Sequence, residues 1–138
     1  MIKIQKKDFN IDLETKIIKD QHSNIGAVTL FIGYVKDFNN NKDVKYIDLD
    51  VYNEMAINEL SKIRDRAISS WNLIDCLIIH RYGKLFVNDK IVLVACFSKN
   101  RANSLKACEF IMDFLKKDAP FWKNEHYKDS SKWLENSK

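Results

Sequence analysis

Along this 138-residue chain, some segments have the apolar pattern of strands and others the apolar pattern of helices. The order of these segments constrains the fold more than any other feature. Runs rich in β-branched and aromatic residues, or alternating between apolar and polar residues, are typical of strands. Strands are predicted for residues 25–35, 44–52, 73–83 and 90–98. Residues 56–71, after Asn53, instead repeat apolar side chains every three or four positions, as does a stretch that opens after Ser98 or Asn100 and ends at or before Ala119. This order predicts an α+β fold in a single domain, residues 1–138, with a mixed, mostly antiparallel sheet and two long helices.

The sequence also predicts the burial of individual strands and the ends and core face of the helices. The stretch 25–35 contains no charged residue and is predicted to be a buried strand, whereas 44–52 alternates and is predicted to be half exposed. Asn53 is predicted to cap the first long helix. Pro120 disfavours helical geometry in the residue before it, which limits the second long helix. The core face of that helix is predicted to consist of Leu105, Cys108, Ile111, Met112 and Leu115. The N-terminal segment predicts a short strand and a polar helix.

Composition places the chain among globular proteins and limits the classes of ligand or partner that are expected. With 46% apolar and 30% charged residues it can bury a core, which a disordered chain cannot. A formal net charge of +4 favours an anionic ligand or partner. Most lysines alternate with acidic residues, as in NELSKIRDR, so the basic stripe typical of nucleic-acid binding is not predicted. No apolar run approaches a membrane span or a signal core, which predicts a cytoplasmic protein without membrane association.

The cysteines and histidines do not indicate a metal site. Cys76, Cys96 and Cys108 each lie in an apolar run, which predicts buried, reduced thiols. No CxxC pair occurs, and none of the three histidines has ligand spacing to another. His80 ends an apolar strand, so a hydrogen-bonded structural histidine is predicted there in preference to a catalytic one.

Two basic residues lie where predicted elements begin or end. At the start of the second long helix, free backbone N–H groups could bind an anion, and Arg101 could add a bidentate phosphate donor. The alternative is an ordinary helix cap followed by a surface arginine. Lys36 follows the end of a strand, where loops commonly carry binding residues, and its alternative is a solvated loop lysine. The residues alone leave both alternatives open.

A third basic cluster surrounds the only proline. Lys116 lies one helical turn before Pro120, and Lys123 follows the aromatic pair Phe121 and Trp122. Proline fixes the corner, and the aromatic residues are predicted to anchor it to the core. Repulsion between two converging ammonium groups would make one of them a proton donor or acceptor near neutral pH. The alternative is a frayed helix end whose lysines offset the helix dipole.

Five motifs, in this order, resemble the large, catalytic subunit of molybdopterin synthase. They are GAVTLFIGYVKDFN, VYNEMA, HRYGKL, KNRANSLKA and IMDFLKKDAPFWKNE, followed by KWLE. The resemblance covers residues 25–134, and LK with APFWK-x-E is its most specific part. It implies an α/β hammerhead fold and a sulfurtransferase of molybdenum cofactor biosynthesis that converts cyclic pyranopterin monophosphate into molybdopterin by forming a dithiolene. It implies no metal or organic cofactor for sulfur transfer.

The resemblance also implies protein partners. Sulfur arrives as a thiocarboxylate on the C-terminal Gly-Gly of a small ubiquitin-like subunit, whose tail enters a pocket of the large subunit. Two large subunits form a homodimer, and a small subunit at each end completes a heterotetramer. In that pocket the lysines meet the phosphate-binding residues, and Arg101 could come from either protomer.

Site residues follow from the matching motifs. The resemblance implies that Lys116 acts directly on the acyl-sulfur centre as acid, base or charge stabiliser, while Lys123 orients the tail or the pterin. The implied substrate-binding residues are Tyr34, Val35, Lys36, Asn100, Arg101, Asn124 and Glu125. Among these, Glu125 would hold a lysine or a polar group of the substrate. Arg101, Lys36 and Asn100 would bind its phosphate.

Three positions depart from the family pattern. Lys36 replaces an arginine and loses the bidentate fork, and Asn100 replaces a histidine and loses a titrating group. Ser130 stands where the family has glycine. The first two departures favour an alternative, a non-catalytic member of the family that keeps the anion or small-subunit site. A stand-alone anion-binding domain without a ubiquitin-like partner is a further alternative.

Overall fold

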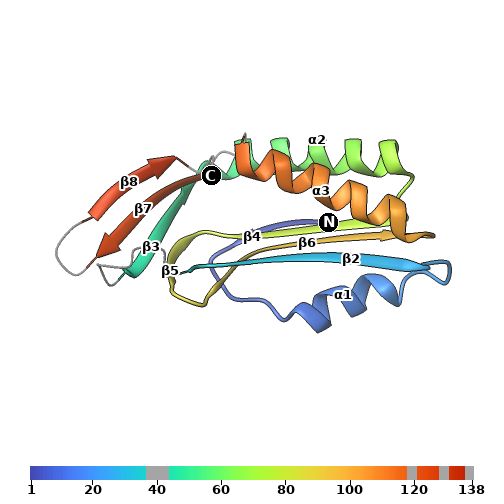
Figure 1. Ribbon diagram of the computed structural model, residues 1–138, viewed down its shortest axis with the longest axis horizontal. Coiled ribbons are helices and arrows are strands. Elements are labelled where there is room, and N and C mark those ends of the chain that lie inside the picture. Colours follow the sequence, from blue (N-terminus) through green and yellow to red (C-terminus); the bar gives the residue numbers. More distant parts are fainter. Residues whose placement is uncertain (37–43, 118–120, 128–130, 136–138) are drawn as a thin grey trace.

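The chain forms three helices and eight strands within the described residues, as seen in a computed structural model (Figure 1). Residues 1–36, 44–117, 121–127 and 131–135 are described, of which 44–45, 122–127 and 131–135 by their backbone alone. The elements are β1 (Ile2–Gln5), α1 (Ile11–Lys19), β2 (Ala27–Tyr34), β3 (Val44–Val51), α2 (Asn53–Trp71), β4 (Asp75–Arg81), β5 (Gly83–Phe86), β6 (Lys90–Ser98), α3 (Arg101–Lys117), β7 (Phe121–Tyr127) and β8 (Ser131–Glu135).

The strands form two four-stranded sheets. Sheet A has the order β1-β4-β6-β2, and sheet B has the order β5-β3-β7-β8. β1 pairs with β4 in parallel, and every other described pair is antiparallel. The predicted α+β class with mostly antiparallel pairing is therefore confirmed, although the strands divide into two sheets and not one.

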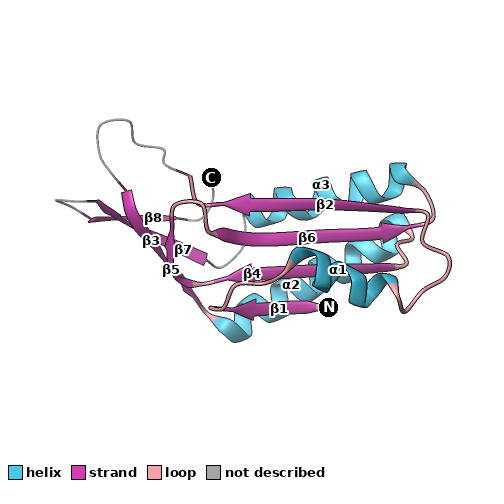
Figure 2. Cartoon of the chain, turned by 90° about the horizontal axis from the view of Figure 1, so that it is seen from below, coloured by secondary structure: helices cyan, strands magenta, loops and turns pink. Residues whose placement is uncertain are grey.

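Helices cover both faces of sheet A (Figures 1 and 2). α2 and α3 lie on one face, where Leu60 and Ile111 are fully buried against β4 and β6. α1 lies on the other face, where Phe9 and Ile18 pack against Leu93 and its neighbours. Because β4 and β6 are covered on both faces, their sequences are almost continuously apolar, as expected for strands buried on both sides.

β2 is the outermost strand of sheet A, opposite β1 (Figure 2). The prediction that residues 25–35 form a buried strand is wrong for much of its length. The side chains of Val28, Leu30, Phe31 and Tyr34 are 39–52% exposed. An uncharged apolar run predicts burial, but the strand order leaves one edge of β2 without a neighbour in the described part of the chain.

Sheet B projects from one end of sheet A, beyond the end of β2 (Figure 1). The chain passes between the sheets at Gly83, whose φ of 85° is a left-handed conformation that glycine adopts without strain. Ile47 and Leu49 of β3 are buried and Asp50 is exposed, which confirms the half-exposed strand predicted from alternation. Strands β7 and β8 were not predicted, because their polar residues show no regular alternation.

Two local predictions for the helices are wrong. Asn53 is already the first residue of α2, and the capping position is Tyr52, whose side chain makes no capping bond. Leu105 is 55% exposed, and Ser104 and Ala107 face the core in its place. Small residues there let α3 lie close to the sheet. Within the described residues no helix is both long and apolar enough to span a membrane.

Candidate active site

The C-terminal end of α3 presents Lys116 to solvent next to a buried residue, Leu115. Residues 118–120 lie outside the described residues, so the proline corner is not part of the observed geometry. Immediately after it, Phe121 is 1% exposed and stacks on the ring of His80, with ring centroids 3.7 Å apart. The predicted aromatic anchor is thus confirmed for Phe121.

His80 has a structural role, as predicted. It is buried, and its Nδ1 lies 2.8 Å from the carbonyl oxygen of Arg81. With one ring face occupied by Phe121, the imidazole joins the end of β4 to the start of β7. It therefore fixes where β7 begins, close to the end of α3.

β7 carries three of the predicted site residues in the middle of sheet B. Lys123 pairs in register with Leu49 on β3, and Glu125 pairs with Ile47. Asn124 lies between them. On its other side β7 pairs with β8. Because β7 has a hydrogen-bonded strand on each side, the backbone positions of these three residues are fixed by the sheet.

The end of β2 brings Tyr34, Val35 and Lys36 to the junction of the two sheets. Tyr34 is 52% exposed, whereas Val35 is 2% exposed and belongs to the core of sheet B. The backbone N–H of Val35 donates to the carbonyl oxygen of Asp89 at 2.9 Å, and its own carbonyl accepts from Asn88 at 2.7 Å. Val35 therefore anchors the chain just before the exposed Lys36.

At the other end of α3, Asn100 and Arg101 form the helix start. The Asn100 side chain accepts a hydrogen bond from the backbone N–H of Asn103 at 3.0 Å, the bond of an N-cap. The hydroxyl of Ser104 lies 2.7 Å from that of Thr29, which ties this first turn to β2. Arg101 is exposed.

The predicted phosphate-binding residues and the predicted catalytic lysine lie at opposite ends of α3. Lys116 lies fifteen positions after Arg101, which in an α-helix is about 22 Å along the axis. That exceeds the combined reach of the two side chains to one reacting centre. The end of β2, which Lys36 follows, and the last turn of α3, which contains Lys116, both lie at the end of sheet A that carries sheet B (Figure 1). Within one chain, therefore, Arg101 cannot share a pocket with Lys116.

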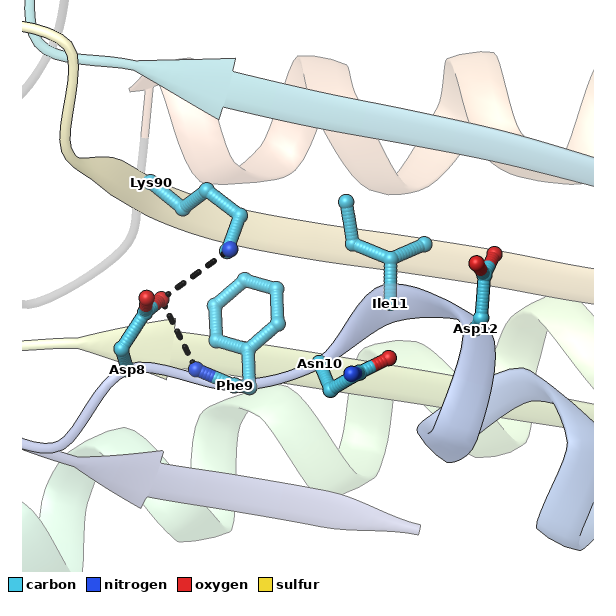
Figure 3. Close-up of a pocket in the computed structure, with 6 residues that line it drawn as sticks. All are labelled: Asp8, Phe9, Asn10, Ile11, Asp12 and Lys90. Atoms are coloured by element: carbon cyan, nitrogen blue, oxygen red, sulfur yellow. Dashed lines mark hydrogen bonds and ion pairs between the residues drawn. The ribbon is translucent and has the colours of Figure 1, made fainter.

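One open hollow occurs elsewhere on the described surface, beside α1 (Figure 3). Its volume is about 560 Å³, and it is lined by Asp8, Phe9, Asn10, Ile11, Asp12 and Lys90. The backbone N–H of Phe9, at 2.8 Å, and then the Lys90 ammonium, at 3.3 Å, hold the pKa of the Asp8 carboxyl below its usual value. These charges offset one another, and no predicted site residue lines this hollow.

Comparison with known proteins decides the family. A family profile described as "MoaE protein" matches residues 4–118. A Ralstonia nicotianae protein named "Molybdopterin synthase catalytic subunit" is 43% identical over 134 residues, which cover 97% of this chain and 76% of that protein. The chain belongs to the MoaE family. This confirms the resemblance drawn from the sequence motifs.

Solved MoaE structures share the fold. A MoaE protein from Burkholderia ambifaria superposes with a TM-score of 0.87 at 36% identity, covering 100% of this chain and 90% of that one. A molybdopterin synthase structure from Staphylococcus aureus gives 0.88 at 28% identity, with 96% and 95% covered. The arrangement of two sheets and three helices is therefore that of MoaE proteins.

Asn100, which departs from the MoaE pattern, has a local structural role as a helix cap. Asparagine is among the best N-cap residues, and here its side chain makes the capping bond to Asn103. The departure at Lys36 lies at an exposed position that the bonds of Val35 hold in place. Ser130, the third departure, lies outside the described residues.

The thiols of this MoaE protein are buried and unpaired, as predicted. Cys76, Cys96 and Cys108 are free cysteines with little or no exposed surface. Hydrogen bonding to Cys108 and Cys76, together with burial, raises the pKa of the Cys96 thiol. In the described part of the chain, no group of three or more His, Cys, Asp or Glu side chains is placed to hold a metal ion.

Proposed function

We propose that this chain is the catalytic subunit of a molybdopterin synthase. The observation that carries the proposal is its similarity, over 97% of its length, to a protein of that name. The reaction is sulfur transfer to cyclic pyranopterin monophosphate, giving the dithiolene of molybdopterin. The sulfur donor is the C-terminal thiocarboxylate of a small ubiquitin-like subunit. The three buried, unpaired cysteines suit the reducing cytoplasm, where we place the protein.

Lys116 is the residue that we assign to the reacting centre. Sulfur transfer brings together a thiocarboxylate, a phosphate and a developing anion, so positive groups must converge where that charge lands. The Lys116 ammonium stands at the end of α3, and β7 holds the backbone of Lys123 next to β3. Lys123 orients the tail or the pterin, and Asn124 and Glu125 complete the polar surroundings.

The phosphate side of the site is completed by a second copy of the chain. Arg101 and Asn100 lie too far from Lys116 along α3 to serve the same substrate atoms. Tyr34 and Lys36 lie at the Lys116 end and can contribute from the same chain. In a homodimer that places the start of one α3 beside the end of the other, all of these groups come together. Such a dimer contains two complete sites.

Reconstitution tests the activity directly. The purified chain is mixed with a thiocarboxylated small subunit and cyclic pyranopterin monophosphate, and molybdopterin is measured. Formation of molybdopterin at a rate that scales with the amount of this chain supports the proposal. Binding of the small subunit without product would indicate instead a non-catalytic family member, the alternative that Lys36 and Asn100 raise.

Subunit complementation tests the shared site. At subsaturating substrate the Arg101→Ala and Lys116→Ala homodimers should each keep about a tenth of the wild-type activity or less, whereas a re-equilibrated equal mixture should regain about a quarter of it. Half of the mixed dimers are hybrids, and one of the two sites in each hybrid then has neither substitution. If both residues served a site within one chain, every site would keep one defect, and the mixture would show only the average activity of the two homodimers.

A further inference from the structure

The three cysteines of the chain lie far apart in sequence but form one buried cluster. Cys76 lies on β4, Cys96 on β6 and Cys108 on α3, and all three belong to the core between sheet A and the helices α2 and α3. The thiol of Cys96 is hydrogen-bonded to both of the other thiols. The proposed active site uses none of them. Thiols in mutual contact can be oxidised to a disulfide, so the cluster is a candidate site for that reaction.

Cys76 and Cys96 are direct partners in the antiparallel register of β4 and β6, which are neighbours in sheet A (Figure 2). The Cys76 carbonyl accepts from the Met1 amino group at 2.8 Å, and the N–H of Ile78 donates to the Met1 carbonyl at 3.0 Å. The backbone groups of Cys76 therefore point toward β1 and away from β6. In such a non-hydrogen-bonded pair the Cα atoms are about 4.5 Å apart and the side chains are closest. A disulfide spans Cα separations of about 4.4–6.8 Å, so this pair can be joined without moving the backbone.

Cys108 differs from the other two cysteines in its exposure and in its acidity. It is 5% exposed, whereas Cys76 and Cys96 are 0% exposed. A hydrogen bond from the Cys96 thiol lowers the pKa of the Cys108 thiol, although burial acts in the opposite direction. The thiolate is the form of cysteine that attacks an oxidant. Among the three thiols, Cys108 is therefore the one that a small oxidant in solvent meets first.

We propose that Cys108, Cys96 and Cys76 form an oxidation site that reacts with a hydroperoxide and yields a disulfide between β4 and β6. The Cys108 thiolate attacks one peroxide oxygen and becomes a sulfenic acid, while the O–O bond breaks and the other oxygen leaves as an alcohol or water. The Cys96 thiol then attacks the Cys108 sulfur, and its proton leaves with the sulfenic oxygen as water. Finally Cys76 attacks Cys96, which forms the Cys76–Cys96 disulfide and returns Cys108 as a thiol. In sum, two thiols lose two electrons and two protons, and the peroxide takes them up.

The sheet favours the final disulfide over the intermediate one. Ladder pairing on both sides of Cys76 and Cys96 fixes these two positions at the separation of a disulfide, whereas Cys108 belongs to a helix that packs on the sheet. Thiol reductants of the cell can reverse the reaction by exchange. None of these steps involves Lys116 or Arg101, so the inference does not depend on the proposed function.

Oxidation of the native wild-type chain tests the site. The fully reduced protein is treated with hydrogen peroxide and then denatured in the presence of an alkylating reagent, and its peptides are mapped by mass spectrometry. The chain should contain a disulfide between Cys76 and Cys96 and one alkylated thiol, Cys108, and a dithiol reductant should restore all three thiols. The inference is overturned if all three thiols are still alkylated, or if the only disulfides join different chains.

Two alanine variants test the order of the steps. Cys108→Ala should slow disulfide formation at least about tenfold, because the first thiolate to react is lost. The matched control is Cys76→Ala, which removes a thiol from the same cluster and should react at the wild-type rate but stop at the Cys96–Cys108 disulfide. Oxidation of Cys108→Ala at the wild-type rate would overturn the inference, as would a Cys76→Ala chain that forms no disulfide. The wild-type map requires no substitution, so it decides the inference even where a variant fails to fold. Molybdopterin formation by the reduced chain is measured separately, so loss of this inference leaves the proposed activity standing.

Discussion

Sheet A and sheet B are built differently, although each has four strands. Sheet A lies between helices, and the side chains of its central strands are buried on both faces. Sheet B has a small buried cluster of Val35, Ile47, Leu49 and Leu85, while Lys84 and Phe86 on β5 are exposed. The predicted catalytic and tail-binding residues lie on sheet B or at its junction with α3. The difference indicates that sheet A supplies rigidity, whereas the proposed site lies on and beside the less extensively buried sheet.

The largest expected effect is the difference in unfolding free energy between substitutions in sheet A and in sheet B. Ile78→Ala removes a fully buried side chain from β4 and should lower the free energy of unfolding by about 2–5 kcal/mol. Phe86→Ala removes a larger side chain that is 51% exposed on β5, and should cost less than about 1 kcal/mol. Urea denaturation of both variants measures the contrast. Equal losses would contradict the view that sheet A carries the stability.

Removing the ammonium at the end of α3 should affect chemistry and not folding. Lys116→Ala should slow dithiolene formation about 100-fold or more, because a positive group next to the reacting atoms is lost. Its binding of the small subunit should stay within a few-fold of wild type. Lys117→Ala is the matched control, since it removes an exposed cation from the same helical turn. Wild-type turnover by Lys116→Ala would remove the catalytic assignment.

Removing the guanidinium at the other end of α3 should affect the substrate more than the partner protein. Arg101→Ala should weaken binding of the pterin phosphate about tenfold, because a bidentate charged donor is lost. Titration with each ligand separately measures this against binding of the small-subunit tail. Lys106→Ala, an exposed cation on the same helix, provides the control. Equal weakening of both ligands would place Arg101 elsewhere in the mechanism.

The free energy of unfolding should also depend on the charge of Asp75, which lies on β4 of sheet A. Burial alone would raise the pKa of its carboxyl, but hydrogen bonds from the Cys76 N–H, His22 and Arg64 together lower it. A lowered folded pKa stabilises the protein above the unfolded value of about 3.9, and this contribution is lost as the pH falls through the folded pKa. Asp75→Asn should therefore cost about 1–2 kcal/mol at pH 7 and progressively less below about pH 4. A deficit that stayed constant with pH would show that the charge is not involved.

The smallest effect is expected at Asn100. Asn100→His restores the family residue and should leave turnover unchanged or raised, while the lost cap lowers the free energy of unfolding by about 1 kcal/mol. Activity and urea denaturation of the same sample separate the two results. A large loss of turnover in a stable variant would mean that the site has been rebuilt around asparagine.

The sequence by itself determined the elements with strong periodicity. β6 occupies the residues predicted for it, α2 differs from its prediction only at its first residue, and α3 ends before Pro120, because burial on one face or on both imposes a regular pattern on the residues. The motifs around Lys116 and Arg101 also sufficed to indicate the family. β7 and β8 escaped prediction, since their polar residues form strands only by pairing with β3 and with each other.

Only the tertiary structure decided which predicted residues can act together. Sequence order places Arg101 and Lys116 in one helix, but the length of that helix holds them apart. Likewise, the apolar stretch 25–35 has the composition of a buried strand, and the strand order alone shows it to be an edge. An apolar composition predicts that a strand is buried. The strand order determines whether the same chain or a second copy buries it.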